Sequence, residues 1–397
     1  MNNKIKKIYT DDRLTAKERL NTVIRLEKPD RVPISLMLYH FAPIHANVKM
    51  SEYMSRPKVY MEVMRNLWKE LGPWDIYYNI NPISRLTYSY VMMMRALWPG
   101  IELKENEMAQ TDEIEYMFSE DYDNILNASP ILSDLKYRLE MLPRFCKEAE
   151  GKNKFKLIAY LARDLLFQML FWRIDFNWWQ KQGAVVQIGH QAEMPFDTFS
   201  QARNVINFSM DLFQRPDKIG MASTKLAINF ANCAVMAATL TGVPLVQCYL
   251  HRSSNSFISP QQFEKLAFPG LEIIVNRIID AGMTPILHCD GDWLKNFKIM
   301  KRLPPKKIIL QLDGLTDIFL AKKEIGDHMC IFGDVPAAKL VTGTSNEVDE
   351  YCHRLIEEVG KDGGFILAGG CEIPPNARFE NLQVMVNSVR KYGYYNN

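Results

Sequence analysis

Two short runs, far apart in the sequence, carry the residue types that bind metal ions. The first is ILHCDGDW (residues 286–293), and the second is GGCE, which ends the last apolar segment of the chain. Alternate side chains of an extended segment point to the same face, so His288 and Asp290 face one way and Cys289 the other. With Cys371 they offer an imidazole, a carboxylate and a thiolate, a set that suits Zn²⁺ and leaves a fourth position open for a substrate. We therefore predict a metal site at His288, Asp290 and Cys371.

A histidine close to a cysteine is not by itself a metal site, because both residue types also serve packing and hydrogen bonding. In the run His328-Met329-Cys330, one residue separates His328 and Cys330, as one separates His288 and Asp290. This run lies at the start of an expected strand, where side chains serve stability rather than chemistry. Cys352 and His353 fall inside an expected helix. Packing and hydrogen bonding therefore remain the alternative interpretation of His288 and its neighbours.

The elements that position these residues are short apolar segments alternating with helical ones. The expected strands are 31–38, 74–81, 184–189, 244–250, 284–289, 307–313, 329–335 and 364–370. The expected helices include 15–26, 58–71, 131–150, 157–182, 261–281, 315–325 and 345–359, and residues 101–108 and 113–120 read as an antiparallel excursion. Most of the strands are bounded by Gly, Pro or charge, as in a buried parallel sheet.

Eight such units predict an α/β protein, a (β/α)8 TIM-type barrel with an N-terminal helical segment, formed by residues 1–397 as a single domain. An open doubly wound sheet is the alternative, although no Gly-x-Gly-x-x-Gly follows any expected strand.

In such a barrel, function lies at the C-terminal ends of the strands. Besides the metal ligands, these ends carry the polar or aromatic residues Tyr39, His40, His190, Glu193, His251, Arg252, Asp313, Asp334 and Glu372. We predict that Asp334 and Glu193 act in catalysis. We predict substrate contacts at Tyr39, His40, His251 and Arg252. A helix cap or a strand-end hydrogen bond is the alternative role for each of them.

Composition excludes several classes of partner. The chain has 48 Lys and Arg against 46 Asp and Glu, so a net charge of +2 gives no electrostatic case for nucleic acid or an anionic membrane. The N-terminal residues are polar and lack the apolar core of a signal peptide, and Arg163 and Asp164 interrupt the apolar stretch 157–172. The seven cysteines have no regular spacing, which indicates reduced thiols. We expect a cytoplasmic enzyme.

Five runs of the sequence resemble the uroporphyrinogen decarboxylase superfamily. They are residues 18–34, 253–269, 288–293, 326–344 and 363–381, and they occur in the order in which that superfamily has them. The resemblance spans nearly the whole chain and is weakest over 47–180. It implies a barrel fold and an active site at the carboxyl ends of the strands.

Within the superfamily, the chain is more similar to corrinoid-linked methyltransferases than to true decarboxylases. The decarboxylases have an arginine-rich loop after the first strand, and here that loop, MLYHFAPIHA (37–46), contains no arginine. The methyltransferases place a zinc-binding His-x-Cys after strand five and a second Cys after strand eight. By position these ligands are His288, Asp290 and Cys371, with Asp where the family has Cys; Cys289 is the alternative to Asp290.

The resemblance implies a zinc-dependent methyltransferase that moves a methyl group between a small substrate and a separate corrinoid protein. The corrinoid-carrier signature Asp-x-His-x-x-Gly does not occur in the sequence, and eight strands of one barrel leave no stretch of about 100 residues for a cofactor domain. A metal-free decarboxylase or lyase and a non-catalytic binding barrel are the alternatives. The identity of the methyl donor or acceptor, the direction of transfer and the oligomeric state, including a homodimer, stay open.

Overall fold

The structure, a computed structural model, describes residues 6–80, 84–128 and 133–395. Its internal contacts divide the chain into two compact units. Unit 1 comprises Met1–Asn81, Trp172–Ile188 and Ile286–Asn397; unit 2 comprises Pro82–Phe171 and Gly189–Pro285. The prediction that residues 1–397 form a single domain stays a prediction.

Unit 1 contains a parallel sheet. Its strands are β1 (Ser35–Leu36), β2 (Ile76–Tyr77), β5 (Val185–Val186), β8 (Thr284–Cys289, entering from unit 2), β9 (Ile309–Leu312), β10 (Cys330–Val335) and β11 (Phe365–Gly369). β2 pairs with β1 and β5, and β8, β9, β10 and β11 pair in that order, all in parallel. A parallel bridge between Ile34 and Leu367 joins the two sets. The strand residues are almost all buried, as expected for a parallel sheet covered on both faces.

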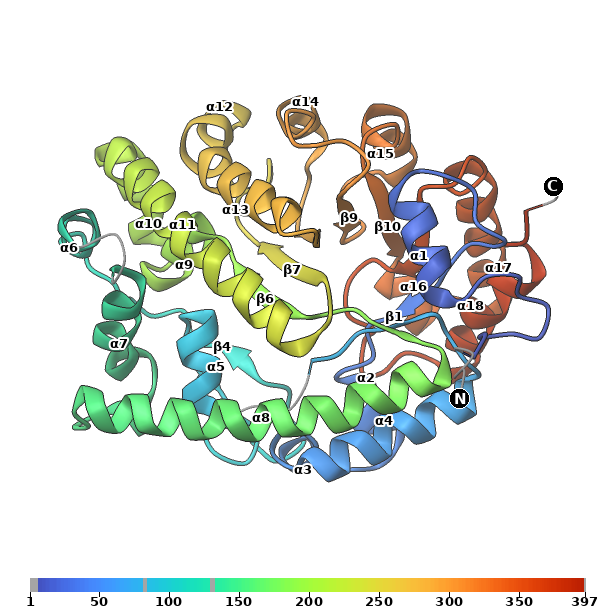
Figure 1. Ribbon diagram of the computed structural model, residues 1–397, viewed down its shortest axis with the longest axis horizontal. Helices are drawn as coiled ribbons and strands as arrows, with labels where there is room; N and C mark the ends of the chain where they lie inside the picture. Colours follow the sequence, from blue (N-terminus) through green and yellow to red (C-terminus); the bar gives the residue numbers. More distant parts are fainter. Residues whose placement is uncertain (1–5, 81–83, 129–132, 396–397) are drawn as a thin grey trace. The chain divides into compact units, whose positions relative to one another are not determined.

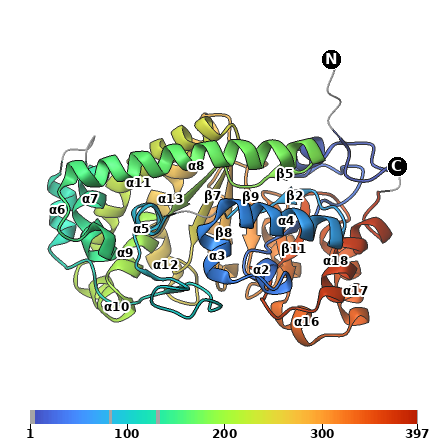
Figure 2. The ribbon, with the colours of Figure 1, turned by 90° about the horizontal axis from the view of Figure 1, so that it is seen from below.

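The helices of unit 1 follow its strands along the chain. They are α1 (Ala16–Ile24), α2 (Phe41–His45), α3 (Met50–Ser55), α4 (Pro57–Leu71), α14 (Phe297–Met300), α15 (Ile318–Ile325), α16 (Ala337–Thr342), α17 (Ser345–Arg354) and α18 (Phe379–Lys391). Short 3-10 or π turns occupy Leu294–Asn296 and Leu355–Val359. Capping boxes start α1, through Thr15 and Glu18, and α17, through Thr344 and Glu347. α17 and α18 pack side by side, as Figure 2 shows in red.

Unit 2 combines helices with two strand pairs. Its helices are α5 (Arg85–Met92), α6 (Asp121–Asn127), α7 (Ser133–Phe145), α9 (Pro195–Ala202), α10 (Val205–Gln214), α11 (Pro216–Thr241), α12 (Pro260–Gln262) and α13 (Phe268–Asp280), with short turns of helix at Lys147–Ala149 and Phe263–Ala267. β6 (His190–Glu193) and β7 (Leu245–Leu250) pair in parallel, and β3 (Ala96–Leu97) and β4 (Gln110–Thr111) in antiparallel. α11 packs along α13 (Figure 1). The long helix α8 (Lys154–Gln182) contains the boundary between the units.

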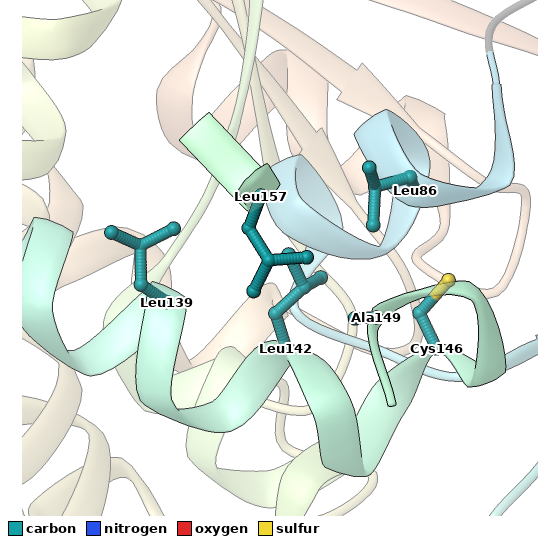
Figure 3. Packing of buried hydrophobic residues seen from close by; sticks show 6 residues of the cluster. All are labelled: Leu86, Leu139, Leu142, Cys146, Ala149 and Leu157. Atoms are coloured by element: carbon teal, nitrogen blue, oxygen red, sulfur yellow. The ribbon is translucent and has the colours of Figure 1, made fainter. Parts of the chain in front are cut away.

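A small apolar core holds the helical part of unit 2 together. Figure 3 shows how side chains from α5, α7, the following 3-10 turn and α8 point toward one another. The six buried residues are Leu86, Leu139, Leu142, Cys146, Ala149 and Leu157. Burial also raises the pKa of the Cys146 thiol to about 12, since it disfavours the thiolate. Cys146 is therefore a small core residue.

Each of the eight expected strand segments contains a strand, which confirms the α/β class. The third segment is followed directly by a second strand, so β5 and β6 are separate. Gly189 stands between them, where a Cβ atom would lie 2.1 Å from the Val243 carbonyl oxygen.

The antiparallel excursion exists, but its predicted strands were placed wrongly. The paired residues belong to β3 and β4, whereas 101–108 and 113–120 form turns and irregular chain. The apolar–polar alternation is short in both runs: the polar residues 105–107 end it in the first, and Met117 and Phe118 end it in the second. The expected helix 131–150 begins outside the described residues and ends early, at Phe145.

A buried network of charges closes the amino-terminal side of the sheet in unit 1. Arg19 forms ion pairs with Asp12, Asp30 and Asp75 at 3.0, 2.8 and 2.6 Å. Arg31 pairs with Asp12 at 2.8 Å and with Asp75 at 2.7 Å. All five side chains are at most 1% exposed. Burial opposes ionisation of Asp75, but the two guanidinium groups outweigh it and hold its pKa below the usual value.

No helix among the described residues is both long enough and apolar enough to span a membrane.

Candidate metal centre

The structure brings the three predicted metal ligands together at the carboxyl ends of β8 and β11. His288 lies in β8, Asp290 follows that strand, and Cys371 follows β11. The His288 Nε2 atom lies 3.2 Å from Asp290 Oδ1 and 3.8 Å from Cys371 Sγ. One ligand atom from each residue falls within 4.8 Å of the others, a grouping that could hold one metal ion. Cys371 lies 83 residues after His288 in the sequence, and the parallel sheet brings the ends of their two strands together.

The turn after β8 is fixed by hydrogen bonds that leave the ligand side chains in place. Gly291 has a φ of 88°, a conformation that favours glycine, and its amide donates to Asp313 Oδ2 at 2.7 Å. The amide of fully buried Trp293 donates to Thr316 Oγ1 at 2.9 Å, and its indole N–H donates to the Asp290 carbonyl at 2.9 Å. The loops after β8 and β9 are thus fastened to each other, which positions Asp290.

Gly370 lets the loop that carries Cys371 pass close to the chain that follows β9. A Cβ atom on Gly370 would lie 2.4 Å from the Asp313 carbonyl oxygen, so no larger residue fits without a shift. The next residue, Glu372, accepts hydrogen bonds at Oε1 from the His40 backbone amide, at 2.7 Å, and lies 2.8 Å from His40 Nδ1. Tyr39 packs edge-on against His40. Two of the predicted substrate-contact residues therefore lie next to the Cys371 loop.

The electrostatics of this triad favour a positive charge. Burial alone lowers the pKa of His288, but the hydrogen bonds to Asp290 and Cys371 outweigh burial and raise it to about 10. The His288 side chain is 4% exposed and Asp290 is 30% exposed, so one side of the site faces solvent. Cys289, the alternative ligand, is fully buried and is not part of the grouping. The chemistry of the donor set fits Zn²⁺, because two anionic ligands would neutralise it and a fourth position stays available.

Asp334, predicted as catalytic, lies in a separate cavity of unit 1. This cavity of about 880 Å³ is lined by residues that include Gly314, Asp317, Phe319, Asp334, Tyr351 and Arg354. The Tyr351 hydroxyl donates to Asp334 Oδ1 at 2.9 Å. Burial, which outweighs that hydrogen bond, raises the pKa of Asp334 to about 7. Tyr351 sits in α17 with no sequence signal that distinguishes it from an ordinary helix residue.

Glu193, the other predicted catalytic residue, lies in unit 2 with the predicted contacts His251 and Arg252. Glu193 ends β6, and its Oε2 atom is 3.4 Å from His251 Nε2. The Arg252 side chain donates to the Ser200 carbonyl at 3.0 Å and pairs with Glu113. Sequence reasoning missed Asp197, which looks like an ordinary acidic residue in the first turn of a helix. Burial and Glu193 raise its pKa to about 7.

Comparison with known proteins agrees with this architecture. Residues 180–392 match the family model described as uroporphyrinogen decarboxylase (URO-D). Two curated relatives are the methylcobamide:CoM methyltransferases MtbA of Methanosarcina mazei and Methanosarcina acetivorans, each 27% identical over 142 residues. The matched part is 36% of this chain and spans only 40% of either relative.

A solved structure resembles the chain over nearly its full length. It is a methyltransferase from Methanosarcina mazei, with a TM-score of 0.64 and 16% identity, covering 96% of this chain and 99% of that one. The likeness confirms the predicted α/β fold of the TIM-barrel type. The family match covers more than half of the chain, and the curated relatives are methyltransferases. The chain belongs to the uroporphyrinogen decarboxylase (URO-D) family, closer to its methyltransferase branch than to the true decarboxylases.

Proposed function

We propose that this protein is a zinc-dependent methyltransferase that moves a methyl group between a small substrate and a separate corrinoid protein. The observation that carries the proposal is the convergence of His288, Asp290 and Cys371 at two strand ends. The URO-D family match and the methyltransferase relatives support the same reading.

In this proposal the three residues bind zinc through Nε2, a carboxylate oxygen and Sγ. When bound, zinc supplies Lewis-acid chemistry, which lowers the pKa of a thiol or stabilises an atom that loses its methyl group. Asp313 and Trp293 hold the turn that carries Asp290, through the hydrogen bonds to Gly291 and to the Asp290 carbonyl. The ligands are therefore preorganised, which fixes the orientation of a substrate atom for an in-line transfer.

The remaining predicted residues have proposed roles in proton transfer and substrate binding, each described within its own unit. Asp334 and Glu193 are buried carboxylates at strand ends and could exchange protons with a substrate. His40, oriented by Glu372 beside Cys371, is placed to contact a substrate, with Tyr39 packed behind it. His251 and Arg252 are proposed substrate contacts in unit 2.

The partner in this proposal is a corrinoid protein that docks transiently, over a modest and partly polar surface. A reducing, cytoplasmic location is part of the proposal and rests on the irregular spacing of the seven cysteines. A homodimer is compatible with the proposal, which does not depend on it.

A reconstituted assay tests the function. Zinc-loaded protein, a corrinoid protein with reduced cobalt and a panel of methylated thiols, amines and ethers are mixed, and the methylcobalt spectrum is followed. We expect a methylcobalt signal with one donor, no signal without the corrinoid protein, and none with Cys371→Ala. Turnover of a methyl donor by the chain alone would contradict the mechanism.

A parallel arm tests the metal-free decarboxylase alternative. The loop 37–46 contains no arginine to pair with the substrate's carboxylates, and such charge-assisted pairs normally carry carboxylate recognition. We therefore expect no coproporphyrinogen from uroporphyrinogen. Its formation by metal-free protein would replace the proposed function with the alternative.

A further inference from the structure

A second group of polar side chains, in unit 2, has hydrogen-bond acceptors that its surroundings do not satisfy. Glu193 has a side chain only 1% exposed. Its Oε1 atom accepts from Gln201 Nε2 at 3.3 Å, but its Oε2 atom has no hydrogen-bond partner among the described residues. The nearest titratable nitrogen, His251 Nε2, lies 3.4 Å from this oxygen. Buried carboxylate oxygens are normally hydrogen-bonded, so this one needs an explanation.

The neighbours of Glu193 increase the shortage of donors. Fully buried Asp197 already accepts at both oxygens, from Ser253 Oγ at 2.5 Å and from the Arg252 amide at 2.6 Å. Gln201 Oε1 and Thr198 Oγ1 are two further buried oxygens without a hydrogen-bond partner in the described part of the chain. Two buried carboxylates and two unsatisfied oxygens favour a ligand that brings N–H donors and a positive charge.

The surfaces beside Glu193 are aromatic and sulfur-containing. Glu193 pairs in register with Tyr249 of the neighbouring parallel strand, so the two side chains lie on the same face of the sheet. Tyr249 stacks on His251, with ring centroids 5.4 Å apart, and packs with Met92 and Met94. Tyr88 packs against the same cluster. Tyrosine faces attract cations and thioethers pack against apolar groups, so these surfaces suit an alkylated cation.

The group is also accessible. The His251 side chain, next to Glu193, is 28% exposed, and Tyr88 is half-buried. Solvent therefore reaches the edge of the group at these two residues.

We propose that Glu193 binds the protonated nitrogen of a small alkylammonium ligand, with Tyr249 and Tyr88 against its alkyl groups. This binding does not rest on the proposed function, because it requires neither zinc nor a corrinoid partner.

The test is a ligand-observed NMR titration of the full chain, without corrinoid protein, using three probes of similar size. Isobutylammonium has charge and N–H donors, tetramethylammonium has charge only, and isobutyl alcohol has no charge. We expect affinity to fall in that order. Glu193→Gln should weaken isobutylammonium binding about tenfold or more, since it removes a charged hydrogen bond. The control Glu150→Gln, an exposed residue of the same unit, should leave it unchanged.

Equal affinity for isobutyl alcohol, unchanged affinity in Glu193→Gln or no binding of any probe would overturn the proposal. If Glu193→Gln does not fold, as judged by circular dichroism, Tyr249→Leu decides instead, with an expected loss of tetramethylammonium affinity of severalfold. Ammonium binding with no methylcobalt in the reconstituted assay would leave this inference standing and remove the proposed function. Methylcobalt formation without ammonium binding would do the reverse.

Discussion

Unit 1 contains two groups of ionisable residues, and they are built in opposite ways. On the amino-terminal side of the sheet, Arg19 and Arg31 share three carboxylates, and almost every oxygen faces a guanidinium or a backbone amide. At the carboxyl ends, Asp290 and Cys371 both lie against one imidazole, and one side of the group faces solvent. The first group is balanced internally, whereas the second is open on one side, where we propose that a metal ion binds.

The difference assigns the two groups different roles. A buried network with all its partners contributes to a unique fold, and it leaves no donor or acceptor for a ligand. Ionisable side chains that converge at a solvent-facing position, as His288, Asp290 and Cys371 do, are candidates for ligand binding. We expect them to contribute less to stability. Substitutions in the network of Arg19 and Arg31 should therefore lower stability. Substitutions at the group of His288 should instead lower function.

The largest expected effect is on stability, from Asp75→Asn. The change leaves Arg19 and Arg31 buried with one counter-charge fewer, and breaking such a pair costs about 3–5 kcal/mol. Urea unfolding measures it. The control Asp362→Asn breaks an exposed pair with Lys28 and should change stability by less than about 1 kcal/mol. Equal effects of the two variants would contradict the structural role of the network.

The next effect is on metal content. Protein purified without chelator should contain about one zinc per chain, and His288→Ala or Cys371→Ala should reduce that to background in elemental analysis. Both variants should stay folded, with a smaller loss of stability than Asp75→Asn. Zinc that is far below one per chain in the wild type, or unaffected by both substitutions, would remove the metal interpretation.

A smaller effect is expected at Asp290, where this chain departs from the His-x-Cys pattern of its family. Asp290→Cys restores the His-x-Cys pattern and should tighten zinc binding about tenfold, because thiolate is the preferred zinc ligand. Competition with a chromogenic chelator measures the affinity. Cys289→Ala serves as the matched control and should change nothing, since Cys289 is fully buried and points away from the group. A larger loss with Cys289→Ala would make Cys289 the ligand.

How far the sequence could predict this architecture depends on which interactions are local. The eight parallel strand segments and the facing of His288 and Asp290 follow from short-range apolar pattern and period, and the structure agrees with both, whereas the antiparallel pair was misplaced. Glu372 with His40, Asp334 with Tyr351 and Glu193 with Asp197 depend on which loops and helices meet in space, which no single run of residues encodes. The charge network of Arg19 and Arg31 was missed for the same reason, since surface and buried arginines look identical in a sequence.

The smallest expected effect comes from Asp334, near the carboxyl end of β10. Its carboxylate accepts a hydrogen bond from the Tyr351 hydroxyl, which is a neutral donor. Burial raises its pKa to about 7, above the value in the unfolded chain, so the folded state binds the proton more tightly. Between about pH 4 and pH 7 the unfolded state therefore holds fewer protons, and this group's contribution to stability falls as pH rises. Asp334→Asn keeps an oxygen that accepts from Tyr351 but cannot ionise. The variant should match the wild type below about pH 4, and its excess in unfolding free energy should grow with pH to at least about 1 kcal/mol at pH 8, since one pKa unit corresponds to about 1.4 kcal/mol. Tyr351→Phe, which removes the one donor, should move the wild-type curve in the opposite direction at pH 8. A pH-independent difference between Asp334→Asn and the wild type would show that the charge of this carboxylate is compensated in the folded state, as it is for the carboxylates around Arg19. The contrast between the two strand ends would then hold only for the predicted metal ligands.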